Sequence, residues 1–119
     1  MPDSADPRSF LPLRSVELDV LLSVTRRPRH GYGILQDADE RSGGRPGFEI
    51  PTLYRALRRM SDQGLIANAE PPEDEERDPR REYWSATALG RRVLTEEIRR
   101  LEVLVEVGRA VEAGPGEVT

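Results

Sequence analysis

The sequence predicts a mainly α-helical fold with one small β-hairpin. Four stretches carry apolar residues at the spacing of one helix face, and two short strand-like runs, 65–70 and 81–87, enclose a segment rich in proline and charge. The last helical pattern, 88–113, is longer than a small domain needs. With 119 residues, the chain is long enough for one domain and too short for two ordinary ones.

The N-terminal residues predict an arm followed by the first helix. Residues 1–12 are rich in proline, serine and aspartate, so they are expected to form a flexible arm. Residues 15–26 have a helical pattern that Ser15 is suited to cap. Leu18 and Leu22 lie on a second apolar face, which indicates burial against another subunit. The stripe that faces the core consists of Val16, Val20, Leu21 and Val24.

After a turn that contains proline, residues 30–42 form the second helical pattern. His30 is the only histidine, and no carboxylate or nucleophile stands at a catalytic spacing from it. A structural or phosphate-facing role is therefore favoured over catalysis or metal binding. The glycine-rich segment 42–50 follows as a turn, and Phe48 and Ile50 are expected to anchor it to the core.

The third helix, within 51–66, is the most informative part of the chain. Pro51 suits its first turn and Gly64 suits the residue after its end. One face is apolar, and the other carries a hydroxyl, a tyrosine and three arginines, which is typical of a helix that enters the major groove of DNA. Taken alone, the same pattern also fits an ordinary amphipathic helix with a solvated arginine face. The apolar face consists of Leu53, Leu57 and Met60.

The tip of the hairpin, 71–80, begins with a run of carboxylates. DNA phosphates would repel them, so the tip is expected to stay in solvent, and only Arg80 and Arg81 on the returning strand are expected to reach DNA. Trp84, the only tryptophan, is expected to pack in the core or on the sheet rather than to stack on a ligand.

The final helix, 88–113, follows a capping residue, Thr87, and carries two apolar stripes. One stripe alternates four- and three-residue spacings, as in a coiled coil, and the other includes Leu104. A helix that extends past a small domain with two apolar stripes predicts a dimer. Residues 114–119 are expected to form a flexible tail. The coiled-coil-like stripe consists of Leu94, Ile98, Leu101 and Val105.

Composition narrows the classes of function. The formal net charge is −4, yet residues 26–59 hold eight arginines against four carboxylates, so the charge is unevenly distributed. The chain has no cysteine, no glycine-rich phosphate loop and no metal-ligand cluster, so an enzyme, a metal and a cofactor are not expected. Without a signal-peptide pattern or a long apolar run, a cytoplasmic protein that does not enter membranes is expected.

Four motifs resemble the PadR family of bacterial transcriptional regulators: HGYGIL (30–35), TLYRALRRM (52–60), QGLI (63–66) and EYWSATALGRRVL (82–94). The single C-terminal helix resembles the short subgroup of that family. The resemblance implies a winged helix-turn-helix DNA-binding domain over 13–87, followed by a dimerisation helix over 88–113. It also implies a homodimeric, sequence-specific regulator, most often a repressor, that binds double-stranded operator DNA.

The expected sites follow from this resemblance. Thr52, Tyr54 and Arg55 near the start of the third helix are expected to meet base edges. Phosphate contacts are expected from Tyr32, Arg58, Arg59, Arg80 and Arg81. The expected dimer contacts are Leu18, Leu22, Leu94, Ile98, Leu101, Leu104 and Val105.

Two further points stay open at the level of sequence. A small-molecule effector, if one exists, is expected at the dimer interface. Family members that bind flat aromatic compounds stack them on a tryptophan of the last helix, and residues 85–119 contain no aromatic residue. The alternative from another class is a winged-helix protein-interaction module that does not bind DNA, which the acidic hairpin tip and the negative net charge favour.

Overall fold

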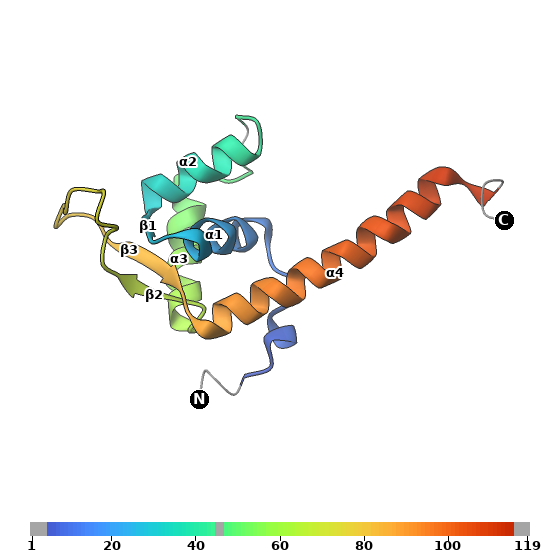
Figure 1. Cartoon of the computed structure of the whole chain (residues 1–119), viewed down its shortest axis with the longest axis horizontal. Helices are drawn as coiled ribbons and strands as arrows, with labels where there is room; N and C mark the ends of the chain where they lie inside the picture. The colour runs from blue at the N-terminus through green and yellow to red at the C-terminus, as the bar shows by residue number, and fades with distance from the viewer. Residues whose placement is uncertain (1–4, 45–46, 116–119) are drawn as a thin grey trace.

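The computed structural model describes residues 5–44 and 47–115 of the chain. Within them, a short 3-10 helix, η2 (Pro7–Phe10), precedes four α-helices and three strands (Figure 1). The helices are α1 (Ser15–Arg26), α2 (Gly31–Arg41), α3 (Ile50–Asp62) and α4 (Ala88–Ala113). The strands are β1 (Arg29–His30), β2 (Ile66–Ala69) and β3 (Tyr83–Ala86).

The strands form one antiparallel sheet in the order β1-β3-β2. The predicted hairpin is its larger part, with Ile66 opposite Ala86 and Ala69 opposite Tyr83. Strand β1 was not predicted, because its two residues lie in a segment with the composition of a turn. It forms because His30 pairs with Tyr83 of β3, which lies far along the chain.

Helices α1 and α3, strand β2 and the start of α4 enclose the hydrophobic core. The predicted apolar face of α3 is confirmed, since Leu53, Leu57 and Met60 are almost fully buried. The core-facing stripe predicted for α1 is also buried. Phe48 packs partly against this core as expected, whereas Ile50 is 52% exposed and does not anchor the turn.

The junction between the hairpin and α4 is held by the side chain of Thr87. The Thr87 hydroxyl accepts a hydrogen bond from the Gly90 N–H at 3.0 Å, which confirms Thr87 as the cap of α4. The same hydroxyl donates to the Gly64 carbonyl at 2.6 Å. Gly64 directly follows the α3 cap residue with φ 77°, as predicted for a glycine at that place.

The first helix begins differently from the prediction. Ser15 is already its first helical residue, and Arg14 is the cap. The Arg14 N–H donates to Oε1 of Glu17 at 2.8 Å, so the third helical residue reaches back to the backbone of the cap residue, as in a capping box.

The segment before α1 packs on α4. Glu97 of α4 is 1% exposed, and its carboxylate accepts the Leu13 N–H at 2.9 Å and bonds from Arg100. The hydrogen bonds from Arg100 lower the pKa of Glu97, although burial opposes them. Residues 1–4 lie outside the described residues, and from residue 5 onward the arm predicted to be flexible instead carries η2 and contacts the core through Phe10.

A buried carboxylate links α1, β1 and α2. The Asp37 side chain is 8% exposed, accepts the Ser23 hydroxyl at 2.8 Å and pairs with Arg41 and Arg29. Burial alone would raise the pKa of Asp37, but the Ser23 hydroxyl and the two guanidinium groups outweigh it and hold the pKa below its ordinary value. The folded state therefore prefers the charged carboxylate.

Asp37→Asn is expected to lower the free energy of unfolding at pH 7 by about 3 kcal/mol, because it removes one partner of a buried ionic cluster. Since the pKa is depressed in the folded state, this stabilisation is present above the ordinary aspartate pKa and is lost as the pH falls through the folded value. Urea unfolding should show a smaller difference in the free energy of unfolding between the variant and the unaltered protein at pH 3 than at pH 7. The exposed Glu40→Gln is the control, and an equal gap at both pH values would contradict the assignment.

Helix α4 projects away from the other elements, and the whole chain measures 60 × 37 × 26 Å (Figure 1). Of the expected dimer residues, Leu94 is buried in the chain's own core, and Leu18 and Leu22 pack partly against it. Ile98, Leu104 and Val105 are 42–52% exposed. The projecting part of α4 therefore has apolar side chains that the chain itself does not cover.

Candidate nucleic-acid interface

The outer face of α3 carries the polar half of the predicted pattern. Pro51 lies in the first turn, where a missing N–H is tolerated, and the buried apolar face turns the opposite side to solvent. Tyr54 is 54% exposed, and Arg55 and Arg58 are also exposed. The Arg55 guanidinium donates to the Thr52 hydroxyl at 3.3 Å, so two residues expected to meet base edges are already in contact.

A groove of about 290 Å³ lies between α3, the start of α2 and strand β3. It combines three arginines with aromatic side chains, which is the chemistry that a phosphate backbone requires. Five of the eight residues expected to contact DNA line it: Tyr32, Tyr54, Arg58, Arg80 and Arg81. His30, for which a structural or phosphate-facing role was favoured, also lines it. Sequence reasoning did not place the remaining lining residues there, namely Gly31, Leu57, Glu82 and Trp84.

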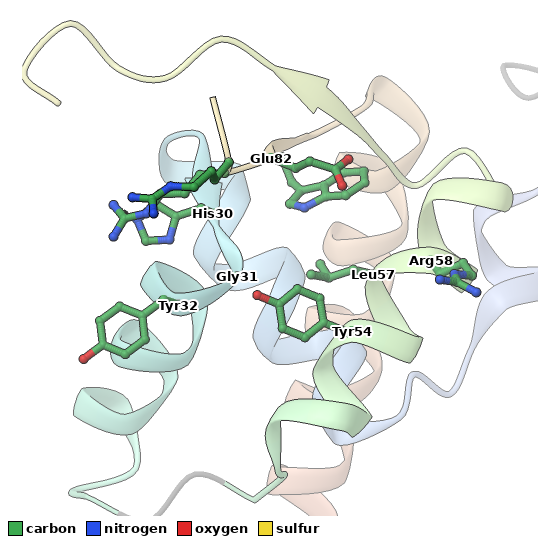
Figure 2. Close-up of a pocket in the computed structure, with 10 residues that line it drawn as sticks. His30, Gly31, Tyr32, Tyr54, Leu57, Arg58 and Glu82 are labelled. Carbon is green, nitrogen blue, oxygen red and sulfur yellow. Dashed lines mark hydrogen bonds between the residues drawn. The ribbon is translucent and has the colours of Figure 1, made fainter. Parts of the chain in front are cut away.

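The floor of the groove depends on a glycine. A Cβ on Gly31 would lie 2.6 Å from the Tyr54 hydroxyl, so any larger residue here would displace the Tyr54 side chain from its position against α2. Figure 2 shows the Tyr54 ring extending from α3 toward Gly31, with Tyr32 further out on α2. The HGYGIL motif contains this glycine, and the close approach gives a physical reason for it.

His30 caps α2 and stands at the edge of the groove. Its Nδ1 accepts the Gly33 N–H at 3.1 Å, so the histidine has the structural role that was favoured. Its ring meets Tyr83 edge-on with 5.2 Å between centroids. Burial lowers the pKa of His30, and the positive charge of Arg81 lowers it further.

Arg59 was expected to contact a DNA phosphate, but its guanidinium is paired with a carboxylate of the chain itself. Its Nε donates to Glu17 of α1 at 3.0 Å, and the two side chains are only 32% and 10% exposed. The carboxylate of Glu17 also caps α1. Arg59 lines a second hollow on α3 with Arg55 and Arg58, but its charge is used to join α3 to α1.

The hairpin tip is attached to the domain, although it was expected to remain in solvent. Arg27 pairs with Asp74 at 2.5 Å and with Glu75 at 3.5 Å, and the Tyr83 hydroxyl donates to Glu75 at 2.7 Å. The hydrogen bond from Arg27 lowers the pKa of Asp74. The acidic run therefore neutralises a basic residue at the end of α1.

Arg80 and Arg81 lie on the returning side of the hairpin formed by β2 and β3 (the wing), and both pair with the carboxylate of Asp78. Arg80 donates to Asp78 through its backbone and side chain, and these bonds lower the pKa of Asp78 to about 2. Arg81 lies farther away, with 3.9 Å between its Nε and Oδ2 of Asp78. Both arginines are exposed, and Arg81 is the less well neutralised of the two.

A helix with an arginine-bearing outer face, a preceding helix whose start lies against it, and a β-hairpin beside its groove together define a winged helix-turn-helix domain. The transcriptional regulator PadR-like family matches residues 20–96, which is more than half of the chain. The protein therefore belongs to this family of transcriptional regulators, as its motifs indicated. Its members regulate transcription and are not enzymes.

Solved structures give the same result. A PadR family transcriptional regulator from Eggerthella lenta is 30% identical, with a TM-score of 0.63 over 89% of this chain and 85% of that chain. A PadR family regulator from Clostridium difficile has a TM-score of 0.67 at 21% identity, covering 82% of this chain and 98% of its own. A PadR-like regulator from Bacillus cereus has a TM-score of 0.70 at 17% identity, covering 83% and 92%. The last two are similar in fold. No curated protein matches this chain.

No helix within the described residues combines the length and the apolar character needed to cross a bilayer.

Proposed function

We propose that this protein is a homodimeric repressor that binds double-stranded operator DNA through the outer face of α3 and the returning strand of the wing. The observation that carries this proposal is the groove that brings Arg58, Arg80 and Arg81 together beside Tyr32 and Tyr54. Thr52, Tyr54 and Arg55 near the start of α3 supply the base contacts, because that end of a recognition helix meets base edges. Arg59 is left out, since Glu17 occupies it.

Arg58→Ala and Arg55→Ala test this interface in different ways. Arg58→Ala should weaken binding to all duplexes alike and reduce the slope of log affinity against log salt by about 1. Arg55→Ala should cost about 1–3 kcal/mol at one operator position and relax specificity there. Both are measured by fluorescence anisotropy, the first with random-sequence duplex at two salt concentrations and the second with sequences selected from a random library.

Arg99→Ala is the matched control. Arg99 is exposed on α4 and pairs with Glu96, so the variant loses the same charge away from the groove. Unaltered affinity in both Arg55→Ala and Arg58→Ala would contradict the proposed face. If the unaltered protein showed no salt-dependent binding to any duplex, the interaction-module alternative would be favoured, which the net charge of −4 and the acidic wing also support.

The second subunit is proposed to cover the projecting part of α4. Exposed apolar residues there continue the same side of the helix that is buried at Val93 and Leu94, so one stripe serves first the core and then the partner. A twofold dimer presents two α3 helices to two half-sites, and this doubling supplies the affinity that an operator needs. Ile98, Leu101, Leu104 and Val105 form the proposed seam.

An effector is proposed to act at the same seam. A ligand that favours a differently spaced dimer would separate the two α3 helices from their half-sites and release the repressor. Gly108 and Ala110 near the end of α4 are small residues, and they would leave room for such a ligand between the two subunits. A ligand bound on the wing, with the seam closed, would contradict this placement.

A further inference from the structure

The contact between His30 and Arg81 lacks an acceptor. Nδ1 of His30 accepts the Gly33 N–H, so this nitrogen carries no proton, and the neutral ring must carry its proton on Nε2. Nη1 of Arg81 lies 3.2 Å from that Nε2. A guanidinium has only donors, and therefore two N–H groups face each other without a hydrogen bond between them.

Neighbouring side chains hold His30 and Arg81 in this position, although their two N–H groups face each other. The His30 ring is fixed by its cap bond and by its edge-on contact with Tyr83. Arg81 interacts with the Tyr83 hydroxyl and, at 3.9 Å, with the carboxylate of Asp78, which is already held by Arg80. The other charged or titratable groups that line hollows with His30 are Arg29, Tyr32, Asp37, Glu40, Tyr54, Arg58, Glu75, Arg80 and Glu82.

We propose that Nε2–H of His30 and the guanidinium of Arg81 together bind one phosphate of the DNA backbone. This inference rests on the proposed function and adds a histidine donor to a site that was expected to bind phosphate through arginines and Tyr32. An anionic oxygen between the two groups accepts from both and relieves the repulsion between the donors. The groove that contains His30 and Arg81 also contains Arg58 and Arg80, so a phosphate chain passing through it meets further positive charge.

Phosphate binding and protonation of His30 are expected to favour each other. In the free protein, burial and Arg81 lower the pKa of His30. A phosphate beside the ring stabilises its protonated form, so the pKa of His30 should be higher in the complex than in the free protein. Because His30 is the only histidine, its titration can be followed by ¹H–¹⁵N NMR without ambiguity of assignment.

The first experiment titrates His30 in the full chain alone, with random-sequence duplex, and with inorganic phosphate. The expected result is an Nε2–H tautomer in the free protein and a raised pKa with duplex. A smaller rise with inorganic phosphate would show that the site recognises the anion itself, and a rise with duplex only would show that it needs the DNA backbone. Duplex binding with an unchanged His30 pKa would overturn the inference while leaving the proposed function intact. Absence of duplex binding would remove both.

His30→Asn separates the cap from the phosphate contact. Asparagine is a favoured cap residue, so α2 should persist, but its short side chain does not reach the position of Nε2. Affinity for random-sequence duplex should fall about tenfold, as for loss of one hydrogen bond to a charged group, with the salt slope unchanged because no charge is lost. Arg81→Gln should lower both affinity and slope. Unaltered affinity in His30→Asn, with unaltered far-ultraviolet circular dichroism, would contradict the proposal.

Discussion

Val105→Glu is expected to convert the protein into monomers. Val105 is 52% exposed on the projecting part of α4, so the monomer's own fold does not depend on it. In the proposed dimer it is buried, and burial of a valine contributes about 1.5–3 kcal/mol. Twofold symmetry introduces the change twice, so the dimer dissociation constant should rise by at least about a hundredfold. Analytical ultracentrifugation over a concentration series measures it.

Val103→Glu provides a control of identical chemistry. Val103 is 57% exposed, and two residues of helix place it about 160° around α4 from Val105. This variant should remain dimeric, and it should retain operator affinity that Val105→Glu loses. A monomeric unaltered protein at micromolar concentration, or equal behaviour of the two variants, would show that the stripe does not form the seam.

Gly90→Ala is expected to destabilise the folded chain strongly. Substitution of glycine by alanine within a helix ordinarily stabilises it by about 1 kcal/mol. At Gly90, however, a Cβ would lie 2.0 Å from the Leu65 carbonyl oxygen, which is backbone and cannot rotate away. The start of α4 would have to move away from Leu65, in the turn between α3 and β2, and we expect a loss of about 3 kcal/mol, at the upper end for overpacked sites.

The control for Gly90→Ala lies in the same helix. A Cβ on Gly108 meets nothing within 4 Å in the chain, so Gly108→Ala should be neutral or stabilising. Both variants are best compared by urea unfolding in the Val105→Glu background, so that the proposed seam does not contribute. Equal stability of the two would mean that Gly90 is not a site of forced contact.

The sequence predicted most where one element determines its own structure. The faces of α3 follow from the apolar spacing of Leu53, Leu57 and Met60, and its end follows from Gly64. The long α4 and its cap at Thr87 were predictable for the same reason. The groove was predicted only in part, because the motifs indicated Tyr32, Tyr54 and Arg58, whereas the contribution of His30 depends on a contact with a residue 51 positions away.

Pairings between distant residues were not predictable from pattern. Arg59 lies one helical turn after Arg55, which is proposed to contact DNA, and only the position of Glu17 shows that the charge of Arg59 is already paired. Arg27 and Asp74 are 47 residues apart, so their ion pair could not be expected from either segment alone. Strand β1 is two residues long and forms only where β3 lies beside it.

The ion pairs of the wing have a consequence for how the protein searches a genome. Arg27 and Arg80 already hold tethered carboxylates, and a tethered partner competes at an effective concentration on the order of millimolar or more. A phosphate must displace that partner before it gains the arginine. We therefore expect contact with arbitrary DNA to release fewer counterions than 18 arginines would imply, which would shorten each non-specific encounter and leave more of the protein free to find the proposed operator.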